Sequence, residues 1–199
     1  LQGRLPGSST EKASKAELMT LLESHDTYLM DLESQQLTLG VLQQRALSML
    51  QDRAFPGTEE EVPILRAITA LQDQCLNMQE KVKNHGKLVK QELQEREAVE
   101  TRINSVKSWV QETKDYLGNP TIEIDTQLEE LKRLLAEATS HQESIEKIAE
   151  EQKNKYLGLY TVLPSEISLQ LAEVALDLKI HDQIQEKVQE IEEGKAMSQ

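Results

Sequence analysis

The stretch VKQELQEREAVETRINSVKSWV, residues 89–110, decides the fold because a helical pattern crosses it with neither proline nor glycine. Ile103, Val106 and Val110 follow one another at steps of three and four, the spacing of one helix face. The pattern continues on both sides, so the sequence predicts one helix over 64–117, about 80 Å long at 1.5 Å per residue. A compact domain of this size does not enclose a straight helix that long. The helix is therefore expected to run from one structural unit into the next.

Further helices are predicted on both sides, because proline and glycine interrupt the chain at only a few places. One is expected over 10–53 and another over 121–163, with Thr121 as its N-cap. The last is expected over 165–193 and ends at Gly194. The sequence predicts an all-α protein with long helices and few turns.

The composition narrows the class of protein. The 199 residues carry 35 acidic against 22 basic side chains, a net charge of −13. Such an acidic surface repels phosphate, which disfavours binding to nucleic acid. No window approaches the roughly 20 consecutive apolar residues of a transmembrane helix. The single cysteine, Cys75, cannot form an internal disulfide, so we expect a reducing, cytoplasmic compartment.

Two internal correspondences indicate a repeat. His25 and His141 lie 116 residues apart, each preceded by serine and flanked by apolar residues at matching offsets. The string QEKV at 79–82 recurs at 185–188, which is 106 residues later. The two offsets differ by ten, which predicts a longer loop around 55–63 than at the last helix junction.

A helix that continues into the next unit, with a period near 106 residues, resembles the spectrin repeat. The resemblance rests on Trp109 in the first helix of the second repeat, on His25 and His141 in the second helices, and on the unbroken linker 93–99. It implies tandem three-helix bundles joined by a continuous helix, with the first repeat incomplete at its amino end. Among spectrin-repeat proteins, the degenerate pattern and the low aromatic content look most like the nesprins, giant linkers of the outer nuclear membrane.

The resemblance sets the expected domain bounds. Residues 1–9 are expected to be a disordered lead, and 10–95 to hold the second and third helices of the first repeat. Residues 96–199 are expected to form the second repeat.

No residue pattern indicates catalysis. His25 and His141 occupy core positions of the heptad pattern, and none of the four histidines has Glu three residues before it, so the Glu-x-x-His motif of di-iron bundles is absent. Cys75 lies on an apolar stripe, where a buried thiol is expected. The tyrosines are expected at the margins of the bundles with their hydroxyls in water, namely Tyr28, Tyr116, Tyr156 and Tyr160. The sequence predicts no enzyme, no metal site and no cofactor.

Charge is distributed unevenly along the chain. Residues 121–199 hold 17 acidic and 8 basic side chains, net −9, against 18 and 14, net −4, in residues 1–120. The acidic residues could steer a basic domain of a partner protein, or they could be an ordinary solvated helix surface. The candidate partner-binding residues are Glu129, Glu130, Glu143, Glu146, Glu150 and Glu151.

The one basic cluster is the lysine group at 81, 83, 87 and 90, beside His85. As a solvated helix face it needs no ligand, and it could also meet an acidic partner.

These observations favour a non-catalytic rod segment that spaces its neighbours and docks a protein partner. If the nesprin resemblance holds, it implies coupling of the nuclear envelope to the actin cytoskeleton on the cytoplasmic side of the outer nuclear membrane. An actin regulator such as a formin is then the expected partner. The alternative is a signalling scaffold of the plakin or dystrophin type that bears no load.

Overall fold

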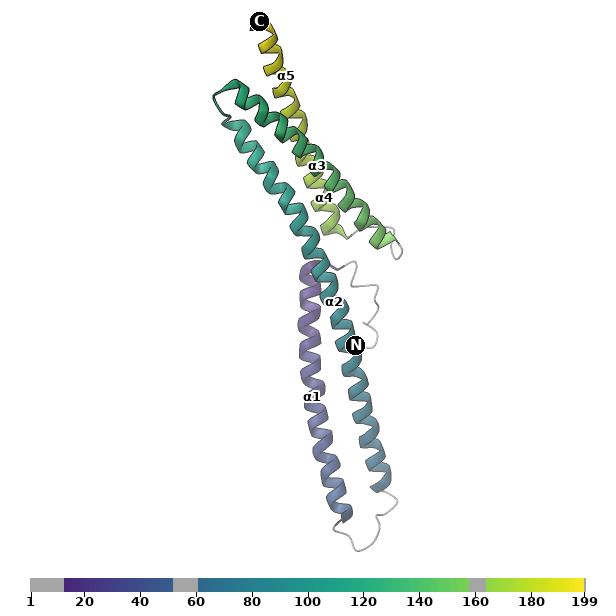
Figure 1. The fold of residues 1–199 in the computed structure, drawn as a ribbon. Helices are drawn as coiled ribbons and strands as arrows, with labels where there is room; N and C mark the ends of the chain where they lie inside the picture. The colour runs from purple at the N-terminus through teal and green to yellow at the C-terminus, as the bar shows by residue number, and fades with distance from the viewer. Residues whose placement is uncertain (1–12, 52–60, 158–163, 199) are drawn as a thin grey trace. The chain divides into compact units, whose positions relative to one another are not determined.

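The computed structural model describes residues 13–51, 61–157 and 164–198, and the described residues contain helices and no strand. This confirms the all-α class. Figure 1 labels the five helices, which are α1 (Lys15–Gln51), α2 (Glu61–Gly118), α3 (Ile124–Leu157), α4 (Ser165–Asp177) and α5 (Ile180–Ser198). The disordered lead predicted for 1–9 and most of the predicted loop at 55–63 lie outside the described residues.

The predicted long helix is confirmed, because α2 runs for 58 residues without interruption. The chain divides into two compact units, which we call the first unit (Lys15–Leu93) and the second unit (Gln94–Gln199), and α2 contributes to both. The assignment of these units to repeats over 10–95 and 96–199 stays a prediction.

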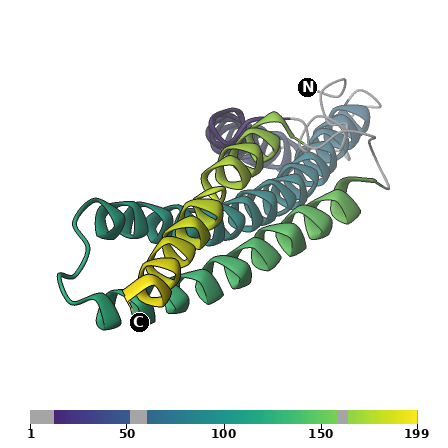
Figure 2. The ribbon, with the colours of Figure 1, turned by 90° about the horizontal axis from the view of Figure 1, so that it is seen from above.

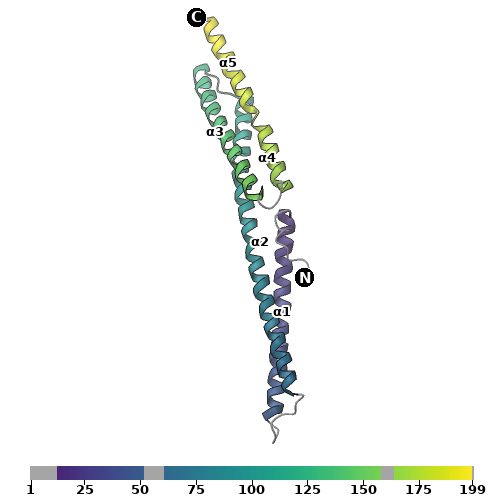
Figure 3. The ribbon, with the colours of Figure 1, turned by 90° about the vertical axis from the view of Figure 1, so that its right-hand side faces the viewer.

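The first unit pairs α1 with the amino-terminal part of α2, and Figures 1 and 3 show the two helices side by side. The helices are antiparallel, because Gln43 of α1 meets Gln72 while the earlier Gln36 meets the later Gln79. The apolar side chains buried between them come from both helices: Leu18, Leu32, Ile68, Cys75, Val82 and Val89. Two helices bury only a narrow stripe of each other, so this core is one layer of side chains deep.

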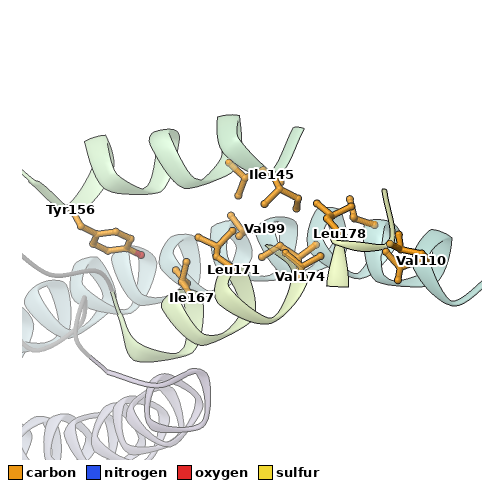
Figure 4. Packing of buried hydrophobic residues seen from close by; sticks show 12 residues of the cluster. Val99, Val110, Ile145, Tyr156, Ile167, Leu171, Val174 and Leu178 are labelled. Atoms are coloured by element: carbon orange, nitrogen blue, oxygen red, sulfur yellow. The ribbon is translucent and has the colours of Figure 1, made fainter. Parts of the chain in front are cut away.

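The second unit is a three-helix arrangement in which the later part of α2, α3 and the α4–α5 segment pack along one another (Figure 2). Figure 4 shows the core, where Val99 of α2, Ile145 of α3 and Val174 of α4 point toward one another. The chain reverses direction after α2, where the backbone N–H of Asn119 donates to the carbonyl of Tyr116 at 3.1 Å. Three helices enclose a core that no pair of them could bury alone.

The structure corrects three expectations of the sequence in this unit. Thr121 is not an N-cap, because α3 begins three residues later at Ile124. Gly194 does not end the last helix, since α5 continues to Ser198. Tyr156 is not at a bundle margin with its hydroxyl in water: only 2 % of its surface is exposed, and it packs in the core of Figure 4.

The last predicted helix is two helices, α4 and α5. Between them the N–H of Lys179 donates to the carbonyl of Leu176, and the N–H of His181 donates to that of Leu178, so the hydrogen bonds span three residues instead of four. This tighter turn rotates the register, and Leu178 and Ile180 are both buried although they are only two residues apart. Both helices carry apolar residues at helical spacing on either side of this short turn, so periodicity alone predicted one continuous helix.

Candidate functional site

All six candidate glutamates lie on α3. Glu143, Glu146 and Glu150 are exposed and share one face of the helix, because residues three, four and seven apart lie on the same side. Glu129 is exposed near the start of α3, about 21 Å along the helix from Glu143. The structure therefore brings three of the six together, and we call Glu143, Glu146 and Glu150 the α3 acidic face.

Two of the six glutamates are already engaged by arginines. Glu130 accepts hydrogen bonds from Arg133 one turn later on α3, and these bonds lower the pKa of the Glu130 carboxyl. Glu151 accepts a hydrogen bond from Arg102 of α2 at 2.9 Å, which lowers the pKa of Glu151 as well. A partner would have to compete with these arginines, so Glu130 and Glu151 are weaker candidates than the α3 acidic face.

A histidine pair lies between the two helices of the first unit. His25 of α1 and His85 of α2 approach with 3.0 Å between Nε2 of His25 and Nδ1 of His85, and the rings are edge to face with centroids 4.9 Å apart. Burial lowers the pKa of both imidazoles, and for His25 the neighbouring His85 lowers it further while Asp26 opposes the shift. Nδ1 of His25 and Nε2 of His85 are buried without a hydrogen-bond partner among the described residues.

The core position predicted for His25 is confirmed, since 5 % of it is exposed, but its pairing with His85 was not predicted. The residue spacing on α2 nevertheless indicates that His85 faces α1. His85 lies seven residues after Met78 on the same helix face, so it continues the stripe that faces α1.

His141 has a different neighbour in the second unit. The ring of Trp109 lies 4.8 Å from it, centroid to centroid, and Trp109 Nε1 donates a hydrogen bond to Glu137 of α3 at 2.8 Å. Trp109 is partly buried and packs against both apolar clusters of the second unit.

The remaining side chains with reactive groups are buried or dispersed. Cys75 is buried as predicted, with its Sγ 3.8 Å from Oε1 of Gln35. In the part of the chain that the structure describes, no three His, Cys, Asp or Glu side chains are grouped so as to hold a metal ion. A search of the same residues finds no helix with the length and apolar character needed to cross a membrane.

Comparison with known proteins points to one group of relatives. The chain is 32 % identical over 194 residues to human nesprin-2, covering 94 % of this chain and 3 % of that protein. It is 31 % identical over 180 residues to mouse nesprin-2, covering 87 % of this chain and 2 % of that protein. No family model matches the chain, and no solved structure matches it. The chain thus spans a few per cent of the length of the curated relatives it matches.

Proposed function

The chain is a nesprin-like segment of the spectrin-repeat type, and from this premise we propose that it is a non-catalytic rod segment of a cytoskeletal linker protein. The observation that carries the proposal is the continuity of α2, which passes the boundary between the two units at Leu93 without leaving the helix. Bending such a helix sharply breaks backbone hydrogen bonds, so α2 resists a change in spacing between the segments joined to its two ends. A segment of this kind spaces its neighbours and transmits tension.

The sharper form of the proposal includes a place and a partner. The nesprin likeness supports a role in coupling the nucleus to the cytoskeleton, on the cytoplasmic side of the outer nuclear membrane. The α3 acidic face supports docking of a protein with a basic domain, and an actin regulator such as a formin fits that role. The alternative is a signalling scaffold of the plakin or dystrophin type, which docks partners without bearing load.

Stretching single molecules tests the rod role. Ala98 is exposed on α2 next to the unit boundary, and Ala98→Pro removes one helix hydrogen bond there without touching either core. The unaltered chain should unfold in one cooperative step across the boundary, whereas Ala98→Pro should unfold in two steps at lower force. Ala98→Ser keeps the N–H and is the matched control. Two separate steps in the unaltered chain would contradict load transmission and favour the scaffold alternative.

Charge reversal tests the docking role. Glu143→Lys, Glu146→Lys and Glu150→Lys together change the α3 acidic face by six charges on exposed positions. Binding of a recombinant formin at low salt should fall at least about tenfold, because steering and rim contacts across the interface are both lost. The same three substitutions at exposed glutamates of the first unit, Glu23, Glu33 and Glu80, are the matched control. Equal loss in both variants would refute docking at the α3 acidic face.

A further inference from the structure

The stripe of α4 and α5 that faces the other helices departs once from the heptad spacing. Up to Leu178 it advances by alternating steps of four and three, and beyond Ile184 the same alternation resumes. Between them it takes two steps of three in succession, with His181 in the middle. Such an irregularity overwinds a helix, because the stripe must come round in fewer residues than the 3.6 of an α-helix turn. The full stripe is Ile167, Leu171, Val174, Leu178, His181, Ile184, Val188 and Ile191.

The turn between α4 and α5 has this overwinding. Besides the bonds that Lys179 and His181 donate there, the backbone N–H of Asp182 donates to the carbonyl of Lys179 at 3.0 Å, again three residues earlier. A helix with such bonds has about three residues per turn. Neither proline nor glycine lies between 165 and 193. The turn therefore follows from the spacing of the stripe and not from a helix-breaking residue.

The buried apolar side chains of the second unit form two clusters that divide at this turn. The first, which we call the α4 cluster, is drawn in Figure 4 and ends on this segment at Ile180. The second, which we call the α5 cluster, joins α3 to α5 and starts on α5 at Ile184. Among the described residues, only Trp109 and Leu117 pack against both clusters. The buried members of the α5 cluster are Leu131, Leu134, Ala138, Ile184 and Val188.

The packing is interrupted at the same place on α3. Between Ala138 of the α5 cluster and Ile145 of the α4 cluster, the stripe position is His141, which is polar and half-buried. A groove of about 310 Å³ also opens here, with Ile145 on one side and Leu178 and His181 on the other. Side chains that line an open groove lack packing partners on that side. Few apolar contacts therefore tie one cluster to the other.

We propose that the α4–α5 turn is an opening point inside the second unit. When it opens, the α5 cluster comes apart and releases α5 together with residues 128–138 of α3, while the α4 cluster stays packed. The part of α2 that carries Val99 to Val110 keeps its packing, because those residues belong to the α4 cluster. Opening exposes the apolar stripe of α5. The proposal does not depend on the rod function, since the opening occurs without load.

Native-state hydrogen exchange of the full chain tests the proposal. Amides of α5 and of residues 128–138 should share one protection factor, about tenfold or more below that of α4 and of residues 145–156. Equal protection throughout the second unit overturns the proposal. A protection factor that rises steadily from the carboxyl end of α5 also overturns it, because that gradient means fraying of a helix end.

Two matched substitutions distinguish a unit of two parts from a single cooperative unit. Ile167→Val shortens a side chain of the α4 cluster and Ile184→Val one of the α5 cluster, both at buried positions. Ile167→Val should lower the protection of α4 severalfold and leave that of α5 unchanged, because the α4 cluster is still packed when α5 opens. Ile184→Val should lower both, since the α5 cluster is lost in either opening. A fall in α5 protection with Ile167→Val overturns the proposal.

An insertion tests the role of the stripe spacing. One alanine added after Lys179 turns the two steps of three into steps of three and four and gives a local repeat of about 3.67 residues per turn, close to that of an α-helix. We expect one continuous helix and a rise in α5 protection of about tenfold or more, to the value of α4. The same insertion after Gln170, where the stripe is regular, is the control and should lower the protection of α4.

Two results of the insertion experiment overturn the proposal. One is low α5 protection in a folded variant with the insertion after Lys179, and the other is the same effect of both insertions. Circular dichroism verifies that each variant is folded. If the insertion after Lys179 prevents folding, the comparison of Ile167→Val with Ile184→Val decides.

Discussion

The two units of this chain apply the same heptad pattern to different numbers of helices. In the second unit three helical segments surround side chains such as Ile148, which is fully buried. In the first unit two helices bury one stripe, in which Leu18 and Val89 are fully buried, and leave Leu37 74 % and Met30 69 % exposed. The second unit also exposes large apolar side chains, Leu169 at 63 % and Leu176 at 61 %. The periodicity of a helix predicts which residues can face a neighbour, and the number of neighbours decides how deeply those residues are buried.

The polar contacts that join the helices also differ between the two units. The second unit joins its helices by ion pairs across the surface, such as Arg102 with Glu151 and Lys107 with Glu173, both at 2.9 Å. The first unit joins α1 to α2 by neutral polar pairs, Gln43 with Gln72 and His25 with His85. The second unit also buries polar side chains, namely Arg96, Thr113 and Gln152, so the two units differ in the kind of polar contact between helices rather than in whether polar groups are buried.

The largest expected effect contrasts the two cores directly. Ile148 and Leu32 correspond across the repeat, and we expect Ile148→Ala to lower the free energy of unfolding by about 3 kcal/mol and Leu32→Ala by about 2 kcal/mol. The difference arises because partly exposed neighbours in the first unit can collapse into the space. Urea unfolding followed by Trp109 fluorescence measures the loss in the second unit. Hydrogen exchange of α1 measures the loss in the first unit. If both substitutions lower the free energy of unfolding equally, or if Leu32→Ala lowers it more, the two cores do not differ in the expected way.

The second largest expected effect on the free energy of unfolding comes from a polar contact of the second unit. Trp109→Phe keeps an aromatic ring against His141 but removes the hydrogen bond to Glu137, and we expect a loss of about 1 kcal/mol in unfolding free energy. Circular dichroism follows this unfolding, since the only tryptophan is lost. Glu137→Gln keeps an acceptor oxygen and is the milder control. A loss near zero would mean that Trp109 stabilises the unit by ring packing alone.

Acid should weaken the first unit selectively. Because the folded pKa of His25 and of His85 lies below the ordinary value of 6.5, the folded state binds fewer protons than the unfolded chain. Stability from this pair is complete above about pH 6.5 and is lost as the pH falls through that value toward the folded pKa values. Hydrogen exchange in α1 should therefore speed up, relative to the pH dependence of the intrinsic rate, as the pH falls below about 6.5.

Glutamine substitution supplies the control for the acid effect. His25→Gln with His85→Gln replaces the pair by the kind of contact that Gln36 and Gln79 already make in this seam. The pH dependence of α1 protection should disappear in this double variant. If it persists, the histidine pair is not its source.

The smallest expected effect is on the surface of the second unit. Glu173→Gln removes the ion pair with Lys107, in which the carboxylate side chain is 66 % exposed, and should cost no more than about 0.5 kcal/mol. Thermal unfolding at low and high salt measures it. A cost above that of Trp109→Phe would show that surface ion pairs, rather than core depth, distinguish the second unit.

The sequence predicted much of this structure because long helices leave a strong periodic signal. Helix α2, the all-α class, the buried thiol of Cys75 and the core position of His25 follow from spacing and from the scarcity of proline and glycine. The break between α4 and α5 was missed because both helices carry the same apolar spacing on either side of a short tight turn. Three of the six candidate glutamates separate from the others because arginines bind Glu130 and Glu151, and because Glu129 lies about 21 Å along α3 from Glu143.

What the sequence determined by itself was where helices form and which stripe of each is apolar, since those depend on residues within two turns of one another. Only the tertiary structure decided the depth of burial and the partner of each polar core residue. His25 and His141 occupy equivalent positions, yet one meets His85 and the other Trp109. These contacts join residues tens of positions apart, and no local pattern specifies which side chains fill the space between packed helices.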